Sequence, residues 1–361
     1  MKDAVLRHHI CGDGYYSKSC ADLLEKRTGA QKALLTNSCT AALEMSALLS
    51  RVGVGDEVIC PSYTFVTTAS AFALRGATPV FCDIRLDTLN IDENAIEALI
   101  TDKTKVIVPV HYAGVSAEMD KICDIARTHN LLVVEDAAQA VGSRYKGKAC
   151  GTLGNLGCYS FHETKNISCG EGGAILINDL SMIEQAEIIR EKDTNRSKFF
   201  RGQIDKYTWV ELGSSYLPGD MVAAYLYPQL LKEDEINARR KKLWKRYHDA
   251  FKEAEQREVL RRPYIPEHCE HNAHMYYLLF NDLETRTRFI AHMKEHDILC
   301  VFHYLPLHSS PAGKRYGRTK GELPVTNKIS DTLVRLPLFY GLDEKAQDFV
   351  IETALKFIRE L

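Results

Sequence analysis

Residues 105–136 have the sequence KVIVPVHYAGVSAEMDKICDIARTHNLLVVED, and this stretch decides the fold class of the chain. Its two ends, 105–112 and 131–136, are short apolar runs, and the segment between them has the periodic apolar spacing of an amphipathic helix. Apolar runs without polar alternation are typical of strands that are buried on both faces of a parallel sheet. The stretch therefore predicts a strand–helix–strand unit with a right-handed crossover.

The same alternation continues on both sides of this stretch and predicts a doubly wound α/β core. Further strands are expected at 32–38, 56–61, 78–84, 158–162 and 172–179. Downstream, we expect a charged loop, a helical segment and two more strands, at 193–215, 219–256, 275–281 and 298–304 respectively. We therefore predict a large, mostly parallel sheet domain, 1–235, and a smaller C-terminal α/β domain, 236–361.

The composition excludes several functional classes. The 361 residues carry a formal net charge of -2, with 45% hydrophobic and 26% charged residues, which argues against a protein that holds nucleic acid by bulk charge. The sequence contains no run of 18 apolar residues, so no membrane span is predicted. The N-terminus lacks the apolar core of a signal peptide. Eleven cysteines without a C-x-x-C pair indicate reduced thiols rather than a disulfide framework or a zinc site. We expect a cytoplasmic enzyme without a metal.

Three groups of polar residues follow predicted strands, where open α/β sheets bind their ligands. The first is Thr36-Asn37-Ser38-Cys39-Thr40, which leads from a strand into a helix. The free N–H groups and the dipole of a helix start favour a phosphate there. An ordinary N-cap explains the same residues.

The second and third groups contain a carboxylate and a lysine. Glu135 and Asp136 end the strand LLVVED, with Gln139 three residues beyond Asp136. A carboxylate at this position is suited to bind a cofactor cation, a metal or a sugar hydroxyl. Capping of the next helix explains the same carboxylate. Lys165 lies in a short link between two apolar strands, where desolvation makes its amine a nucleophile, although most lysines are merely solvated. Together, a phosphate cup, an acid and a lysine indicate pyridoxal phosphate.

Longer segments carry a resemblance to a known family. They are TNSCTAALEMSALL, GDEVICPSYTFVTTASAFALRGATPVF, VIVPVHYAG, VVEDAAQA, SFHETKN, GEGGAILIND, EIIREKDTNRSKFFRGQIDKYTW and CVFHYLPLH. With these segments the chain resembles the DegT/DnrJ/EryC1/StrS sugar aminotransferases over nearly its whole length. The resemblance implies the type I, aspartate aminotransferase-like fold, pyridoxal 5'-phosphate as cofactor, and a homodimer with shared active sites. It also implies about twenty further residues before the CGDG segment.

The resemblance also assigns roles to individual residues. Lys165 matches the lysine that forms the Schiff base, and Asp136 matches the carboxylate that faces the pyridinium nitrogen. The other implied cofactor contacts are Gln139 to the ring hydroxyl, Phe65 stacked on the ring, and Ser38, Cys39, Thr40 and Ser160 at the phosphate. His308, in YLPLH, matches a residue near the sugar.

The implied reaction moves the amino group of L-glutamate to C4 of dTDP-4-keto-6-deoxyglucose, giving dTDP-4-amino-4,6-dideoxygalactose for surface polysaccharide. Three alternatives stay open: the same transfer to a GDP- or UDP-linked 4-keto sugar, a non-catalytic regulator that binds pyridoxal phosphate, and a dehydratase relative. Lys165 and the absence of a cysteine cluster motif argue against the dehydratase.

Overall fold

A computed structural model describes all 361 residues, and its largest element is an eight-stranded sheet with the order β1-β9-β8-β5-β4-β2-β3-β13. Neighbouring strands from β13 to β8 pair in parallel, whereas β9 runs antiparallel to both β8 and β1. The strands are β1 Lys32–Thr36, β2 Glu57–Pro61, β3 Thr78–Cys82, β4 Thr104–Ile107, β5 Leu132–Asp136, β8 Leu156–Ser160, β9 Gly173–Ile177 and β13 Arg318–Thr319.

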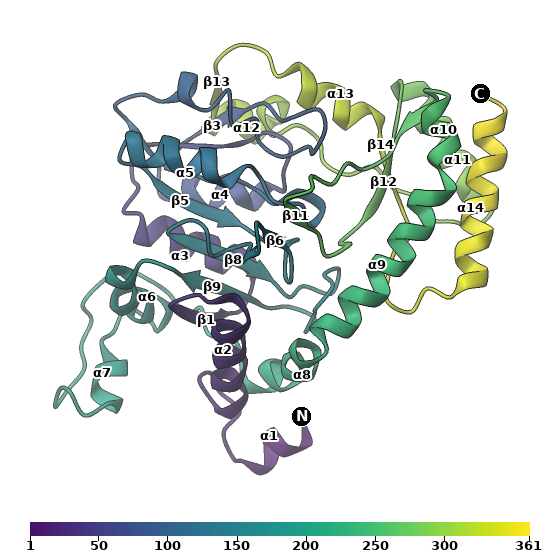
Figure 1. The fold of residues 1–361 in the computed structure, drawn as a ribbon. Coiled ribbons are helices and arrows are strands. Elements are labelled where there is room, and N and C mark those ends of the chain that lie inside the picture. The colour runs from purple at the N-terminus through teal and green to yellow at the C-terminus, as the bar shows by residue number, and fades with distance from the viewer.

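Helices cover both faces of this sheet (Figure 1). Successive residues of β1 show why, because Leu34 belongs to the apolar cluster on one face and Leu35 to the cluster on the other. The first face is covered by α3 Cys39–Leu49, α4 Val66–Ala73 and α6 Ile183–Arg190. The second is covered by α2 Tyr15–Thr28, α5 Met119–Thr128 and α8 Asp220–Leu231. The predicted doubly wound architecture is confirmed.

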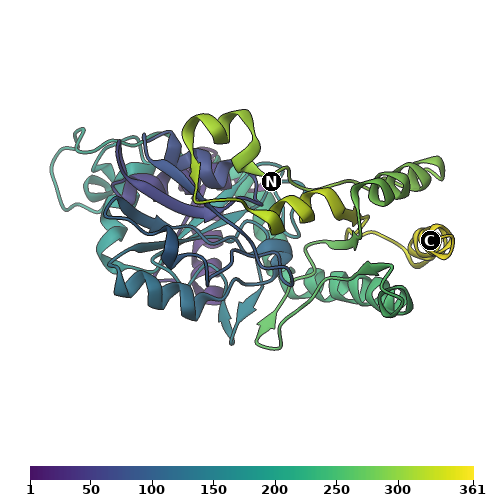
Figure 2. The same cartoon turned by 90° about the horizontal axis from the view of Figure 1, so that it is seen from above.

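The C-terminal part builds a smaller antiparallel sheet with the order β10-β12-β14. Its strands are Leu260–Arg261, Tyr276–Phe280 and Leu333–Leu336, and they pack with α9 Glu233–Ala250, α11 Leu283–Glu295 and α14 Glu344–Arg359 around a separate apolar cluster. Figure 2 shows this unit beside the large sheet. The long helix α9 connects the two cores, because Ile236 packs in the large one and Leu243 in the small one.

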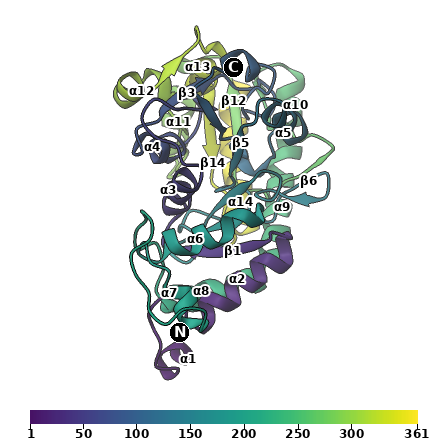
Figure 3. The same ribbon diagram turned by 90° about the vertical axis from the view of Figure 1, so that its left-hand side faces the viewer.

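Shorter elements complete the fold. Helices α1 Lys2–Leu6 and α7 Arg196–Phe200 lie at the end of the molecule remote from β12 and β14 (Figure 3). The others are α10 Lys252–Gln256, α12 Pro311–Tyr316, α13 Pro324–Thr332, and a small sheet of β6 Arg144–Tyr145, β7 Lys148–Ala149 and β11 Cys269–Glu270. None of the helices combines the length and the apolar character that a membrane crossing requires.

Three segments differ from the expectation. The predicted loop 193–215 contains α7, and the helical segment 219–256 is divided into α8, α9 and α10. Residues 298–304 form no strand beyond a single bridge between Val301 and Arg335, because His303 and Tyr304 make hydrogen bonds to loops of the large sheet. The boundary at 235/236 stays a prediction, and the structure adds that β13 returns to the large sheet.

Candidate active site

A cavity of about 740 Å³ lies at the carboxyl ends of the parallel strands, between the large sheet and the small domain. Its wall contains eight of the nine residues to which the resemblance assigns a role: Ser38, Cys39, Thr40, Phe65, Asp136, Gln139, Ser160 and Lys165. The small domain contributes residues 274–275, 299, 301, 303–304 and 335–339. The position agrees with the general rule for ligands of open α/β sheets.

The turn between β1 and α3 is shaped to accept an anion. Ser38 is the N-cap of α3, and its Oγ accepts a hydrogen bond of 3.0 Å from the N–H of Ala41. Cys39 and Thr40 follow in the first turn, where N–H groups have no acceptor within the helix. On the neighbouring strand β9, a Cβ on Gly173 would lie 2.5 Å from the nitrogen of Cys39. Because Gly173 has no side chain, the turn can pack directly against β9. The capping role and the anion site are compatible.

Asp136 is a buried carboxylate at the end of β5, with 5% of its surface exposed. Its Oδ2 accepts a hydrogen bond of 2.7 Å from the hydroxyl of Thr68, and its Oδ1 accepts one of 3.2 Å from the N–H of Ala138. Burial raises the pKa of Asp136, while Thr68, Ala138 and the charge of Lys165 act in the opposite direction. A cationic N–H group in the cavity would favour the anion further.

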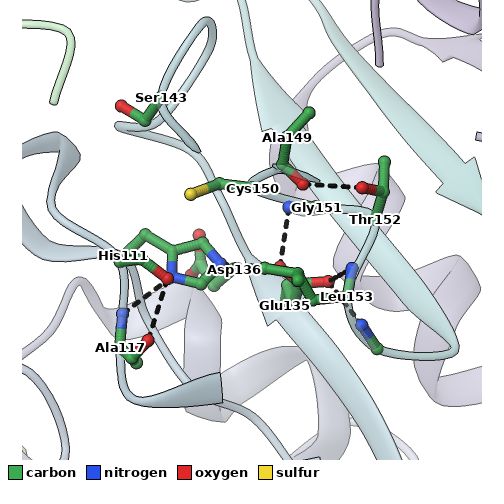
Figure 4. A network of polar contacts seen from close by, with 12 residues as sticks. His111, Ala117, Glu135, Asp136, Ser143, Ala149, Cys150, Gly151, Thr152 and Leu153 are labelled. Atoms are coloured by element: carbon green, nitrogen blue, oxygen red, sulfur yellow. Dashed lines mark hydrogen bonds and ion pairs between the residues drawn. The ribbon is translucent and has the colours of Figure 1, made fainter. Parts of the chain in front are cut away.

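Glu135, the preceding residue, points to the other side of the sheet and has a structural role (Figure 4). Its fully buried carboxylate accepts hydrogen bonds of 2.6–2.7 Å from the N–H groups of residues 151, 153 and 154. It also contacts His111 Nε2 at 2.8 Å. Because the N–H of Ala117 donates to His111 Nδ1, Nε2 carries the proton and donates to Glu135. Of the two carboxylates, only Asp136 serves the cavity.

Lys165 lies in the link between β8 and β9, where its backbone N–H donates to the carbonyl of His162 at 2.9 Å. Its amine forms no ion pair in the chain, although Asp136 and Cys39 line the same cavity. Burial lowers the pKa of Lys165, Cys39 and Asp136 counteract this effect, and the charge of Arg335 adds to it. A lysine with a lowered pKa supplies the free amine that nucleophilic and general-base catalysis need.

Gln139 and Phe65 border the space between Asp136 and the small domain. Gln139 Oε1 accepts a hydrogen bond of 2.7 Å from the N–H of Ala113, and its Nε2 donates to the hydroxyl of Tyr304 at 2.9 Å. The ring of Phe65 is 54% exposed, with its centroid 6.4 Å from that of Tyr304. An aromatic face is thus available to a ligand ring.

A chain of amides fixes the state of His274, another residue of the wall. The amide nitrogen of Asn166 donates to the carbonyl of Asn272 at 2.8 Å and to Oδ1 of Asn237 at 2.9 Å. Its oxygen must therefore accept from His274 Nδ1, 3.2 Å away. Burial lowers the pKa of His274 well below its usual range, and nearby positive charges add to the effect. The ring is neutral, and its Nε2 is an acceptor.

His308 lies outside the cavity wall. Its Nδ1 is 2.7 Å from the hydroxyl of Ser62, near the start of the loop that leads to α4. Conversely, sequence reasoning missed Thr68, His274, Tyr304 and Arg335, which the fold brings to the cavity or to Asp136. The segment SYTFVTT already contained Thr68 beside Phe65, whereas no local signal identified Arg335.

The residues present fit pyridoxal phosphate. The anion-binding turn at Ser38, the buried Asp136 and the free amine of Lys165 surround one cavity, as the phosphate, the pyridinium nitrogen and the aldehyde of that cofactor require. Phe65 offers a stacking face, and the amide of Gln139 lies within the same wall. The donor set thus suits this cofactor better than a metal, for which the chain provides no cluster of three candidate ligands.

Comparisons with known proteins agree with this chemistry. The model of the DegT/DnrJ/EryC1/StrS aminotransferase family matches residues 2–355. The chain is 34% identical over 342 residues to the spore coat polysaccharide biosynthesis protein SpsC of Bacillus subtilis, covering 92% of this chain and 86% of SpsC. It is 35% identical over 361 residues to the pleiotropic regulatory protein of Geobacillus stearothermophilus, covering 99% and 93%.

Solved structures show the same fold at lower identity. The aminotransferase TlmJ from Streptoalloteichus hindustanus matches with a TM-score of 0.90 and 28% identity, covering 99% of this chain and 94% of TlmJ. The Streptococcus pneumoniae protein Spr1654 matches in its PLP form with a TM-score of 0.89 and in its PMP form with 0.90. Both forms are 28% identical and cover 99% of this chain and 94% or 95% of Spr1654.

Proposed function

The chain belongs to the DegT/DnrJ/EryC1/StrS aminotransferase family, and we propose that it transfers the amino group of L-glutamate to C4 of dTDP-4-keto-6-deoxyglucose. It is a pyridoxal-phosphate-dependent aminotransferase with the type I fold. The proposed product is dTDP-4-amino-4,6-dideoxygalactose, a precursor of surface polysaccharide. The name of its relative SpsC, a polysaccharide biosynthesis protein, supports this setting.

One observation carries the proposal: the amine of Lys165, whose pKa is lowered by burial, and the carboxylate of Asp136 line the same cavity. When bound, pyridoxal phosphate supplies an aldehyde and an electron-withdrawing ring. Asp136, as the anion, keeps the pyridinium nitrogen protonated. Lys165 takes a proton from Cα of the donor and later delivers a proton on the acceptor side. One amine thus serves as base and acid in the two half-reactions.

The other residues of the wall bind and orient the cofactor in this proposal. Ser38, Cys39, Thr40 and Ser160 hold the phosphate at the N-terminus of α3, whose dipole favours the negative charge. Phe65 stacks on the ring, and Gln139 donates to the ring oxygen with the second N–H of its amide, since the first is donated to Tyr304. His308 stays a proposed neighbour of the sugar, from outside the wall.

We further propose a cytoplasmic homodimer with shared active sites. All eleven cysteines are free thiols, which supports a reducing compartment. The exposed side chains of Phe200, Tyr207 and Trp209 lie in the segment that resembles the family around α7, which supports an interface there. A sedimentation experiment on the holoenzyme tests the dimer.

The absorption spectrum of the protein with pyridoxal phosphate tests the function. Glutamate should bleach the yellow band of the bound cofactor, and dTDP-4-keto-6-deoxyglucose should restore it. GDP- and UDP-linked 4-keto-6-deoxy sugars serve as matched acceptors. If only one of these restores the yellow band, the enzyme is specific for that nucleotide instead. A band that no amino acid bleaches would overturn the proposal.

A second candidate function is a non-catalytic regulator that binds pyridoxal phosphate. The name of the Geobacillus stearothermophilus relative, a pleiotropic regulatory protein, favours it. The two functions differ in turnover, because a regulator would bind the cofactor and the sugar without producing 2-oxoglutarate. Multiple turnovers per active site would exclude the purely regulatory function.

A further inference from the structure

His274 presents to the active-site cavity a hydrogen-bond acceptor that no group of the chain uses. The residue is 8% exposed and lines the cavity. Its Nδ1 donates to Oδ1 of Asn166 at 3.2 Å, so the free lone pair of the neutral ring lies on Nε2. Nε2 itself forms no hydrogen bond within the chain, not even with the amine of Lys165. A buried acceptor without a donor is costly to the folded protein, so this nitrogen calls for a ligand.

The ring that carries this acceptor is held in place from two sides. The backbone carbonyls of Ala273 and His274 accept hydrogen bonds of 3.1 and 2.7 Å from the guanidinium of Arg240. Asn166, which binds Nδ1 of the ring, is the residue that directly follows Lys165 in the chain. The position of Nε2 is therefore fixed relative to the segment that carries the reacting amine.

The surroundings of Nε2 favour a neutral donor over a cation. Burial lowers the pKa of His274 well below its usual range, and the positive charges of Lys165, Arg240 and Arg335 add to the effect. The positive potential that keeps a proton off Nε2 also disfavours an ammonium group beside it. A hydroxyl donates a hydrogen bond without bringing a charge. The ligand group that suits Nε2 is therefore a hydroxyl.

Of the two proposed substrates, only the keto sugar carries a hydroxyl. Glutamate offers an ammonium group and carboxylates. The sugar has a hydroxyl on C3, the ring carbon bonded to the reacting C4, whereas C5 on the other side of C4 carries the methyl group of a 6-deoxy sugar. Because Asn166 ties the ring of His274 to the residue after Lys165, the hydroxyl nearest to the reacting carbon is the one best placed for Nε2.

We propose that Nε2 of His274 accepts a hydrogen bond from the C3 hydroxyl of the keto sugar and thereby positions C4 beside Lys165. This inference rests on the proposed aminotransfer to a 4-keto-6-deoxy nucleotide sugar. It makes His274 a specificity-determining residue of the acceptor half-reaction alone. A 4-keto sugar without a hydroxyl at C3 should be a poor acceptor, because Nε2 would then stay buried without a donor.

Two variants separate the structural role of the ring from its role toward the sugar. His274→Asn retains a donor for Asn166, because its amide nitrogen lies near the place of Nδ1, but it has no acceptor at the place of Nε2. His274→Gln brings its amide oxygen near the place of Nε2 and so keeps an acceptor. His8→Asn is the matched control, since His8 is exposed near the N-terminus and lies outside the cavity wall.

The acceptor half-reaction is followed by the return of the yellow band with dTDP-4-keto-6-deoxyglucose and with its 2-deoxy and 3-deoxy analogues. In His274→Asn we expect the second-order rate constant to fall about tenfold for the parent and the 2-deoxy sugar, which corresponds to one lost hydrogen bond. For the 3-deoxy sugar it should change less than about threefold, because the hydrogen bond is already missing. His274→Gln should restore part of the loss. The donor half-reaction with glutamate should be unchanged in both variants, and His8→Asn should leave both half-reactions unchanged.

Binding of dTDP-6-deoxyglucose provides a readout that does not need turnover, because this sugar has no keto group. Calorimetry on the holoenzyme should show that His274→Asn binds it about tenfold more weakly than the wild type does. The 3-deoxy form of the same sugar should bind equally to both proteins. Circular dichroism and cofactor content verify that the variants are folded and loaded. The comparison of the two sugars in the wild type needs no variant and should give the same tenfold difference.

Three results would overturn the inference. They are an unchanged acceptor half-reaction in His274→Asn, an equal loss with the 3-deoxy sugar, and an equal loss in the donor half-reaction, which would show that His274 acts on Lys165 or on the cofactor. Failure of the proposed function looks different, because no keto sugar would then restore the yellow band of the wild type, and the inference would fall with it. If a GDP- or UDP-linked sugar alone restores the band, the 3-deoxy form of that sugar decides the role of His274.

Discussion

The substitution Gly173→Ala tests whether the turn at Ser38 binds the cofactor phosphate. Gly173 begins β9 and pairs with Thr36 of β1 and Ser160 of β8. An added Cβ would lie 2.4 Å from the carbonyl carbon of Ser38 and 2.5 Å from the nitrogen of Cys39. Both are backbone atoms, so no flexible side chain can move aside.

The required displacement sets the size of the effect. Ordinary contacts of a Cβ begin at 3.4 Å, so the turn and β9 must separate by about 1 Å. Forcing an extra methyl group into a packed region costs roughly 1–3 kcal/mol of stability. A displacement of about 1 Å in a binding site costs on the order of 100-fold. We therefore expect the affinity for pyridoxal phosphate to fall by one to two orders of magnitude, together with a moderate drop in Tm.

Titration of the apoenzyme with pyridoxal phosphate measures the first effect, and thermal unfolding measures the second. Inorganic phosphate, added as a competitor, should weaken cofactor binding in the wild type and have less effect in Gly173→Ala. Gly53→Ala is the matched control, because a Cβ there meets no atom within 4 Å. A cofactor affinity in Gly173→Ala equal to that of the wild type would refute the placement of the phosphate at this turn.

Three further predictions address the base, the buried carboxylate and pH. Lys165→Ala should give a folded dimer that binds cofactor without turnover, whereas Lys148→Ala, on an exposed strand, should be fully active; steady-state assays with gel filtration decide this. Glu135→Ala leaves three backbone N–H groups and His111 without an acceptor. Urea titration should therefore show a free energy of unfolding that is lower by at least about 3 kcal/mol. A smaller decrease would contradict the role of Glu135 in this network. Burial lowers the pKa of His271 from 6.5 to about 4. Between these two pH values the unfolded chain binds a proton at His271 that the native chain does not bind. The free energy of unfolding should therefore fall as the pH falls, by up to about 3 kcal/mol. His271→Gln should reduce that slope in urea titrations from pH 7 to 4, and an unchanged slope would contradict the assignment.

The local sequence was sufficient to predict a site residue wherever its role depends only on its own strand or turn. The run LLVVED predicted both the strand β5 and the carboxylate at its end, and the helix start at Ser38 followed from its small hydroxyl residues. The same reasoning could not separate Glu135 from Asp136, because the two point to opposite sides of the sheet. Only the packed fold shows that Glu135 is bound by three N–H groups and His111.

The remaining site residues depend on contacts between distant segments. Arg335 and Tyr304 reach the cavity because the small domain packs beside the large sheet, and no local pattern encodes that packing. At 298–304 the local sequence instead predicted a strand that the structure does not contain. Its apolar and aromatic residues have strand propensity, yet His303 bonds to Tyr112 and Tyr304 to Gln139, so tertiary contacts override the local preference.

The short strand β13 has a consequence for how the protein is made. Residues 318–319 pair with Val80 and Phe81 of β3, and Arg318 binds Glu57 at 2.7 Å. During synthesis β3 leaves the ribosome long before β13 exists, so one edge of the large sheet is open while most of the small domain is still being translated. The nascent chain therefore exposes an unpaired strand until the chain returns. A chain stopped after residue 235 would keep that edge permanently, and we expect such a fragment to self-associate.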